Sequence, residues 1–188
     1  MARNDQRRAL LADAGIRVLA EQGARGLTHR AVDAAAGTPR GTASNYFPTR
    51  DDLVAALVDR IGRRLQPDPQ AVPNAATAQP DRARFTAYIR DVVRRLGADP
   101  QVAIALFELR LEAARRPGIA DVLLTWRQSA FEGDVAFNEG AGLPGGRSEI
   151  ALLHYAIDGL MLDHLTAPLD TGLAVEDAVD ELVDRILR

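Results

Sequence analysis

Residues 28–47 read THRAVDAAAGTPRGTASNYF, and they carry the clearest structural signal of this chain. Thr28 is a good N-cap for a short helix, because its hydroxyl can accept a hydrogen bond from an early backbone N–H. Gly37 suits a tight turn, and Pro39 suits the first turn of a second short helix that reaches about Asn45. Two short helices joined by a glycine turn predict a helix-turn-helix.

The side chains of the second helix fit a DNA major groove. That groove is about 12 Å wide, so the leading side chains must be short or directional. Arg40 can donate two hydrogen bonds to guanine O6 and N7, and Thr42 can offer a methyl group or a hydroxyl to a base edge. Thr28, Tyr46 and Arg50 could hold phosphates on either side of the groove. The predicted DNA-binding residues are Thr28, Thr38, Pro39, Arg40, Gly41, Thr42, Ser44, Asn45, Tyr46 and Arg50.

Helical patterns continue on both sides of this stretch. A helix is expected from about Asp5 to Gln22, with Gly23 as its terminator. Thr49 caps the next helix, which reaches Leu65. Beyond a proline-rich linker at 67–80, the pattern predicts helices at about 81–97, 100–115, 118–138, 147–167 and 174–187.

The fold class that follows is all-α with about nine helices, because strand signals are nearly absent. The predicted division is a DNA-binding domain at 1–48, a connecting helix at 49–66, and a larger ligand-binding and dimerisation domain at 67–188.

Composition excludes several classes of protein. The 188 residues are long enough for a sizeable core. Cysteine is absent, which excludes disulfides, thiolate catalysis and cysteine metal sites, and no cofactor or metal site is expected. No apolar run has the length of a membrane span or the look of a signal peptide, so no membrane partner and a cytoplasmic location are expected.

Charge is distributed unevenly along the chain. Residues 1–65 carry 11 arginines against seven acidic residues, a net charge of +4, whereas residues 66–188 carry 12 arginines against 19 acidic residues, a net charge of −7. A basic first part on an acidic body suggests that the first part meets a polyanion such as DNA.

A set of residues in the first part forms a recognisable frame: Leu11-x-Asp13-Ala14, Gly23, Thr28, Val32, Ala36-Gly37, Gly41-Thr42, Tyr46-Phe47, Arg50 and Leu53. With this frame, residues 7–57 resemble the TetR family of bacterial repressors. Two positions depart from the usual pattern: Asp33 stands where the family has a small residue, and Ser44 where it has a tyrosine that commonly contacts a phosphate.

The resemblance implies a homodimeric repressor that binds a palindromic double-stranded DNA operator and is released by a small-molecule effector. Two subunits would then place their recognition helices about 34–36 Å apart, which is one turn of DNA. The helix at 49–65 joins the two modules and would transmit the effector signal.

The C-terminal helices have the faces that such a dimer needs. From Ile150 to Leu165, 11 of 16 residues are apolar and wrap around most of the helix, so several sides must be covered. The last helix is apolar on one face. The predicted dimer interface consists of Leu153, Ile157, Leu160, Val175, Val179, Leu182 and Ile186.

Candidate effector contacts are polar or aromatic groups within apolar faces. Phe107 and Trp126 fit a plain core role as well. His154 and Asp158 lie four residues apart on one helix and could form a buried pair, anchor a ligand, or belong to a metal site. The candidate ligand-binding residues are Phe85, Tyr88, Phe107, Arg110, Trp126, His154, Tyr155, Asp158 and Met161.

An enzyme and a helical adaptor are the two other classes of function that the sequence could suggest. Residues 140–145 match G-x-G-x-x-G formally, but they follow no predicted strand and contain a proline, so no dinucleotide site is expected. The sequence offers no nucleophile motif, and we expect no enzyme. A helical dimeric adaptor without DNA binding is the remaining alternative, and it would lack salt-sensitive DNA binding that depends on Arg40.

Overall fold

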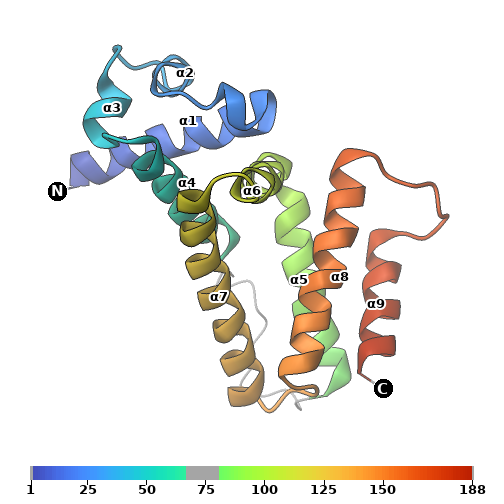
Figure 1. Ribbon diagram of the computed structural model, residues 1–188. Helices are drawn as coiled ribbons and strands as arrows, with labels where there is room; N and C mark the ends of the chain where they lie inside the picture. The colour runs from blue at the N-terminus through green and yellow to red at the C-terminus, as the bar shows by residue number, and fades with distance from the viewer. Residues whose placement is uncertain (1, 67–80, 188) are drawn as a thin grey trace. The chain divides into compact units, whose positions relative to one another are not determined.

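The computed structural model describes residues 2–66 and 81–187, and within these ranges the chain is all-α (Figure 1). The predicted linker at 67–80 lies outside the described residues. The helices of the described part are α1 (Ala2–Gly26), α2 (His29–Ala35), α3 (Thr42–Tyr46), α4 (Arg50–Leu65), α5 (Arg82–Ala98), α6 (Pro100–Ala113), α7 (Pro117–Gly140), α8 (Arg147–Thr166) and α9 (Val175–Ile186).

The helices form two compact units. Among the described residues, the first unit comprises 2–66 and 99–126, and the second comprises 81–98 and 127–187. Helix α6 and the start of α7 therefore pack with the N-terminal helices, although they lie far away in the sequence. The predicted domains were continuous segments that ended at residues 48 and 66, whereas the first compact unit also includes residues 99–126. The functions assigned to those segments stay a prediction.

The core of the first unit is built from α1, α4 and α6. Leu11, Leu57 and Leu109, one from each helix, are at most 1% exposed. Gly15 lets α1 and α4 approach closely, because a Cβ there would lie 2.9 Å from the Leu57 side chain. The α1 helix breaks at Gly23, where φ is 67°, so the predicted terminator is confirmed.

Ion pairs reinforce this core at its edge. The Arg60 guanidinium on α4 donates two hydrogen bonds to the Asp13 carboxylate on α1, both 2.8 Å long. Arg64, one turn further along α4, pairs with both Asp13 and Asp99, which is the N-cap residue of α6. One arginine thus links α4 to α1 and to the start of α6.

The second unit contains α5, the second part of α7, α8 and α9. Helix α5 packs against both α8 and α9, and α8 lies beside α9 (Figure 1). Phe85, Leu153 and Val179, one from each of these helices, are at most 2% exposed. Arg90 of α5 forms an ion pair with Asp180 of α9 at the edge of this core. Among the described residues, no helix has the length and apolar character required to cross a bilayer.

Candidate nucleic-acid interface

Helices α2 and α3 form the predicted helix-turn-helix. The Thr28 hydroxyl accepts a hydrogen bond from the Ala31 N–H at 3.1 Å, which confirms Thr28 as the N-cap of α2. Gly37 has a φ of 62° in the turn that follows. Helix α3 begins at Thr42, so the expectation that Pro39 lies in its first turn is wrong. Pro39 instead lies in the turn before it, where its carbonyl accepts from the Thr42 N–H at 3.1 Å.

The start of α3 is held by a carboxylate from α2. The N-cap residue of α3 is Gly41, which has no side chain and a φ of 87°. Asp33, 3% exposed, takes the role of the cap. Its carboxylate accepts hydrogen bonds from the N–H groups of Gly41 at 2.8 Å and Ala43 at 2.7 Å, and from the Thr38 hydroxyl at 3.2 Å.

The end of α3 is held by two side chains from other helices. The Arg8 guanidinium on α1 donates to the Tyr46 carbonyl at 3.1 Å and lies over the Phe47 ring, 4.9 Å from its centroid. The His29 Nε2 lies 2.6 Å from the Phe47 carbonyl. Both ends of this five-residue helix are therefore fixed by groups outside it.

The predicted base-reading residues lie in α3 and in the turn before it, and several of them are exposed. Arg40 and Asn45 are exposed, and within the described ranges Arg40 has no ion-pair partner. The hydroxyls of Thr42 and Ser44 donate to the carbonyls of Pro39 and Gly41 at 2.6 and 3.0 Å. Pro39, Gly41 and Ser44 are also exposed, while Thr38, Thr42 and Tyr46 are half-buried.

Arg50 has a different surrounding from the one expected for a phosphate contact. Its guanidinium donates to the carbonyl of Leu27 at 2.5 Å and to that of Ala24 at 2.7 Å. These two bonds tie the start of α4 to the last turn of α1 and to the connection that follows it. In this structure the Arg50 side chain therefore stabilises the packing of the domain.

Sequence reasoning missed two parts of this arrangement. Arg8 was not singled out, because its target is a backbone carbonyl 38 residues away and no local pattern predicts such a pair. Asp33 was noticed only as a departure from the family pattern. A carboxylate within an apolar stretch, eight residues before a glycine that opens a helix, was the available signal.

Comparison with known families decides the identity of this fold. Residues 11–57 match the family model described as bacterial regulatory proteins of the tetR family, and residues 80–188 match the tetracyclin repressor-like C-terminal domain. The chain belongs to the TetR family. It is therefore a DNA-binding transcriptional regulator with an all-helical body, and not an enzyme.

Individual relatives agree with this assignment. The HTH-type transcriptional regulator BetI of Rhizobium meliloti (strain 1021) is 30% identical over 120 residues, or 64% of this chain and 58% of BetI. The multidrug binding protein EbrR, solved with imidazole, is 29% identical, with a TM-score of 0.69 over 97% of this chain and 95% of EbrR. A TetR family member from Streptomyces coelicolor A3 is also 29% identical, with a TM-score of 0.72 over 97% and 98% of the two chains.

The candidate effector contacts of this TetR-family chain are divided between the two units. Phe107, Arg110 and Trp126 belong to the first unit. The Trp126 ring packs close to α4, because a Cβ at Gly62 would lie 2.5 Å from its Nε1. The Arg110 guanidinium lies over the Phe107 ring at 5.8 Å.

The other six candidates belong to the second unit and occupy different surroundings. Phe85 and Met161 are buried, the Tyr88 ring meets Phe137 edge-on at 4.9 Å, and Tyr155 is 69% exposed. His154 and Asp158 do not bond to each other. Among the described residues, His154 lies 3.0 Å from the Asp134 carboxylate, whereas Asp158 pairs with Arg127 at 3.2 Å. No group of histidine and acidic residues suited to a metal is present in the described ranges.

The predicted dimer residues are divided between the core and the surface of α8 and α9. Leu153, Ile157 and Val179 are at most 8% exposed, because the α8 and α9 faces that carry them pack within the protomer. These three offer little surface to a second subunit in this structure, and their place in the interface stays a prediction. Val175, Leu160, Leu182 and Ile186 are half-buried and remain available.

Proposed function

We propose that this TetR-family regulator is a ligand-responsive repressor that binds a palindromic operator as a homodimer. The observation that carries the proposal is the α3 helix, which is held at both ends while Arg40, just before it, and Asn45, within it, are exposed. A rigid helix with an exposed directional donor is the arrangement needed to read base edges.

Arg40 is the proposed base reader. Its guanidinium can donate two parallel hydrogen bonds to guanine, a contact that discriminates against other bases by about 1–3 kcal/mol. Asn45 and the methyl group of Thr42 are the proposed further base contacts. Thr28, Ser44 and Tyr46 are the proposed phosphate contacts. The Thr28 hydroxyl accepts from the Ala31 N–H and can still donate to a phosphate, whereas a phosphate must compete with the Gly41 carbonyl for the Ser44 hydroxyl.

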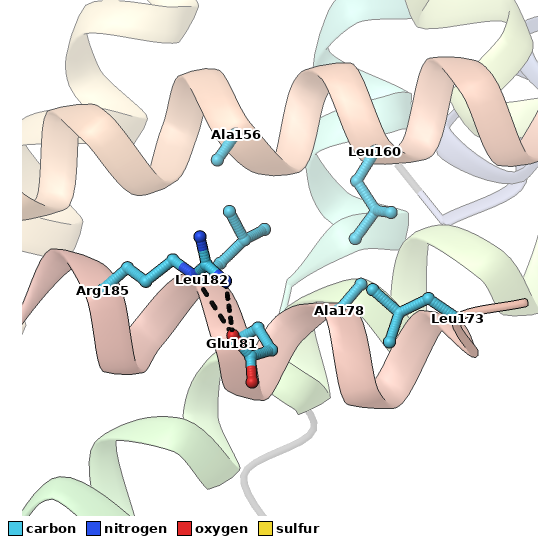
Figure 2. A pocket seen from close by; sticks show the side chains of 7 residues that line it. All are labelled: Ala156, Leu160, Leu173, Ala178, Glu181, Leu182 and Arg185. Carbon is cyan, nitrogen blue, oxygen red and sulfur yellow. Dashed lines mark hydrogen bonds and ion pairs between the residues drawn. The ribbon is translucent and has the colours of Figure 1, made fainter. Parts of the chain in front are cut away.

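The groove between α8 and α9 is the proposed dimer interface. It is lined by Ala156, Leu160, Leu173, Ala178 and Leu182, with the Glu181–Arg185 ion pair at its side (Figure 2). Leu173 is 50% exposed and continues the apolar surface into the loop before α9. An apolar groove flanked by an ion pair suits an isologous contact with a second copy of the chain.

A small apolar molecule is the proposed effector class. EbrR, 29% identical to this chain, is named a multidrug binding protein. The aromatic pair Tyr88 and Phe137, with buried Phe85 and Met161, supplies the apolar contacts in the second unit. The effector acts only through its different affinities for two conformations of the dimer, and α4 is the proposed link to the DNA-binding helices.

Selection of bound sequences from a random duplex pool tests this function. We expect enriched palindromes with half-sites about one helical turn apart, and a dimer mass by light scattering. A folded chain that enriches no sequence contradicts operator recognition and leaves an adaptor role. Enrichment of a single half-site by a monomer contradicts the dimer alone.

A further inference from the structure

The buried carboxylate of Asp33 has no arginine partner among the described residues. Its side chain is 3% exposed, and burying an ionised group is costly unless polar partners replace the lost water. Two backbone N–H groups and the Thr38 hydroxyl are those partners. A neutral residue would avoid this cost, so the carboxylate must contribute something that packing alone does not.

Helix α3 cannot hold its own first turn. It has five residues, far fewer than an isolated helix needs to be stable. The first N–H groups of a helix have no partner within it, and Gly41 at the N-cap has no side chain to supply one. The Asp33 carboxylate binds the N–H groups on both sides of Thr42, at Gly41 and Ala43. The direction in which α3 leaves the turn is thereby fixed to α2.

We propose that Asp33 is the positioning residue of operator recognition: it fixes the start of α3 so that Arg40 and Asn45 face one major groove. This inference rests on the proposed DNA-reading function. Because Asp33 occupies the N–H groups at the start of α3, DNA phosphates do not bind there, and specificity depends on side chains beyond the cap.

In Asp33→Asn, the lost negative charge and the lost helix cap are expected to change DNA affinity in opposite directions. Removing a negative charge beside DNA strengthens non-specific binding, because phosphates then meet less repulsion. Losing the cap weakens specific binding, because an amide group cannot accept at both N–H groups. The ratio of specific to non-specific affinity therefore separates a positioning role from a purely electrostatic one.

The experiment measures binding of the full chain to a selected operator and to a scrambled duplex. We expect Asp33→Asn to lower operator affinity about tenfold, as for the loss of a buried polar contact, and to leave scrambled-duplex affinity equal or higher. Asp59→Asn, which removes an exposed carboxylate from α4, is the matched control and should keep the native ratio.

Amide hydrogen exchange of the native chain gives a second test that does not depend on a variant folding. We expect the Gly41 and Ala43 amides to exchange more slowly than the amide of Arg40, and to lose protection selectively in Asp33→Asn. Fast exchange of both amides in the native chain overturns the proposal.

The binding experiment distinguishes failure of the positioning role from failure of the proposed function. Selective binding that survives Asp33→Asn within twofold overturns the positioning role and leaves the proposed function intact. If the native chain binds no duplex selectively, both the proposed function and this inference fail.

Discussion

The Glu108 carboxylate on α6 accepts a hydrogen bond from the backbone N–H of Ala24 at 3.2 Å. Ala24 directly follows the break of α1 at Gly23, and its carbonyl is bound by Arg50 of α4. The segment that leads into the helix-turn-helix is thus held from α6 and from α4. A movement of α4 or of α6 would reach the start of α2 through these contacts, so the proposed coupling between effector and DNA could use α6 as well as α4.

Removal of the Glu108 carboxylate is the first test of this connection. Glu108→Ala leaves the Ala24 N–H, which is buried, without its partner, and we expect a loss of about 1–2 kcal/mol in the free energy of unfolding. Exchange of the Ala24 amide should accelerate selectively. Glu139→Ala removes an exposed carboxylate elsewhere and should leave both quantities unchanged. Unaltered exchange at Ala24 in Glu108→Ala speaks against the contact.

We expect the Arg50 side chain to contribute more to the free energy of unfolding than to DNA affinity. Arg50→Ala removes both donors from the carbonyls of Ala24 and Leu27, at an expected cost of about 2–3 kcal/mol by urea unfolding. Arg63→Ala, on the same helix with a 66% exposed side chain, should change stability by less than about 0.5 kcal/mol. A fully stable Arg50→Ala with weakened DNA binding would instead identify Arg50 as a phosphate contact.

A charge in the groove between α8 and α9 should separate the subunits without unfolding them. In Leu182→Glu an ionised group replaces a half-buried leucine of the groove, and like charges then meet across a two-fold interface. We expect a monomer mass by light scattering with a native far-UV spectrum. Leu111→Glu, at a 58% exposed leucine of α6, is the control and should stay dimeric. A dimeric Leu182→Glu places the interface elsewhere.

The acid titration of Glu132 reports the contact between α7 and α8. Hydrogen bonds from the Arg147 guanidinium, followed by the Gln128 amide, lower the pKa of the Glu132 carboxyl from 4.5 to about 2. Because this pKa is lower in the folded chain, the contribution to stability is complete above pH 4.5 and is lost as the pH falls toward 2. Carbon NMR should show the Glu132 pKa rising toward 4.5 in Arg147→Ala but not in Arg185→Ala. An unshifted Glu132 in the native chain contradicts the pair.

Local signals account for the parts of the fold that could be predicted. Thr28 and Thr49 cap α2 and α4 as expected, because a hydroxyl before a helix has few other partners. Gly23 and Gly37 take the left-handed conformations that only glycine adopts easily. These signals extend over a few residues, so a single sequence reveals them.

Long-range contacts account for what was missed. Arg8 meets Tyr46 across 38 residues, and Glu108 meets Ala24 across 84. His154 was paired with Asp158 by helical spacing, yet it meets Asp134 of the neighbouring helix. The apolar pattern of α8 did not reveal which face packs inside the protomer, because nearly all of its faces are apolar.

Sequence-selective DNA binding through Arg40 can be measured by fluorescence anisotropy. The native chain and Arg40→Ala are titrated with the DNA beside the gene and with a scrambled duplex, at two salt concentrations. We expect tight, salt-dependent binding of the native chain to one duplex, a loss of about 1–3 kcal/mol in Arg40→Ala, and an unchanged dimer mass. Equal operator affinity of the native and Arg40→Ala chains would contradict sequence-selective binding through Arg40.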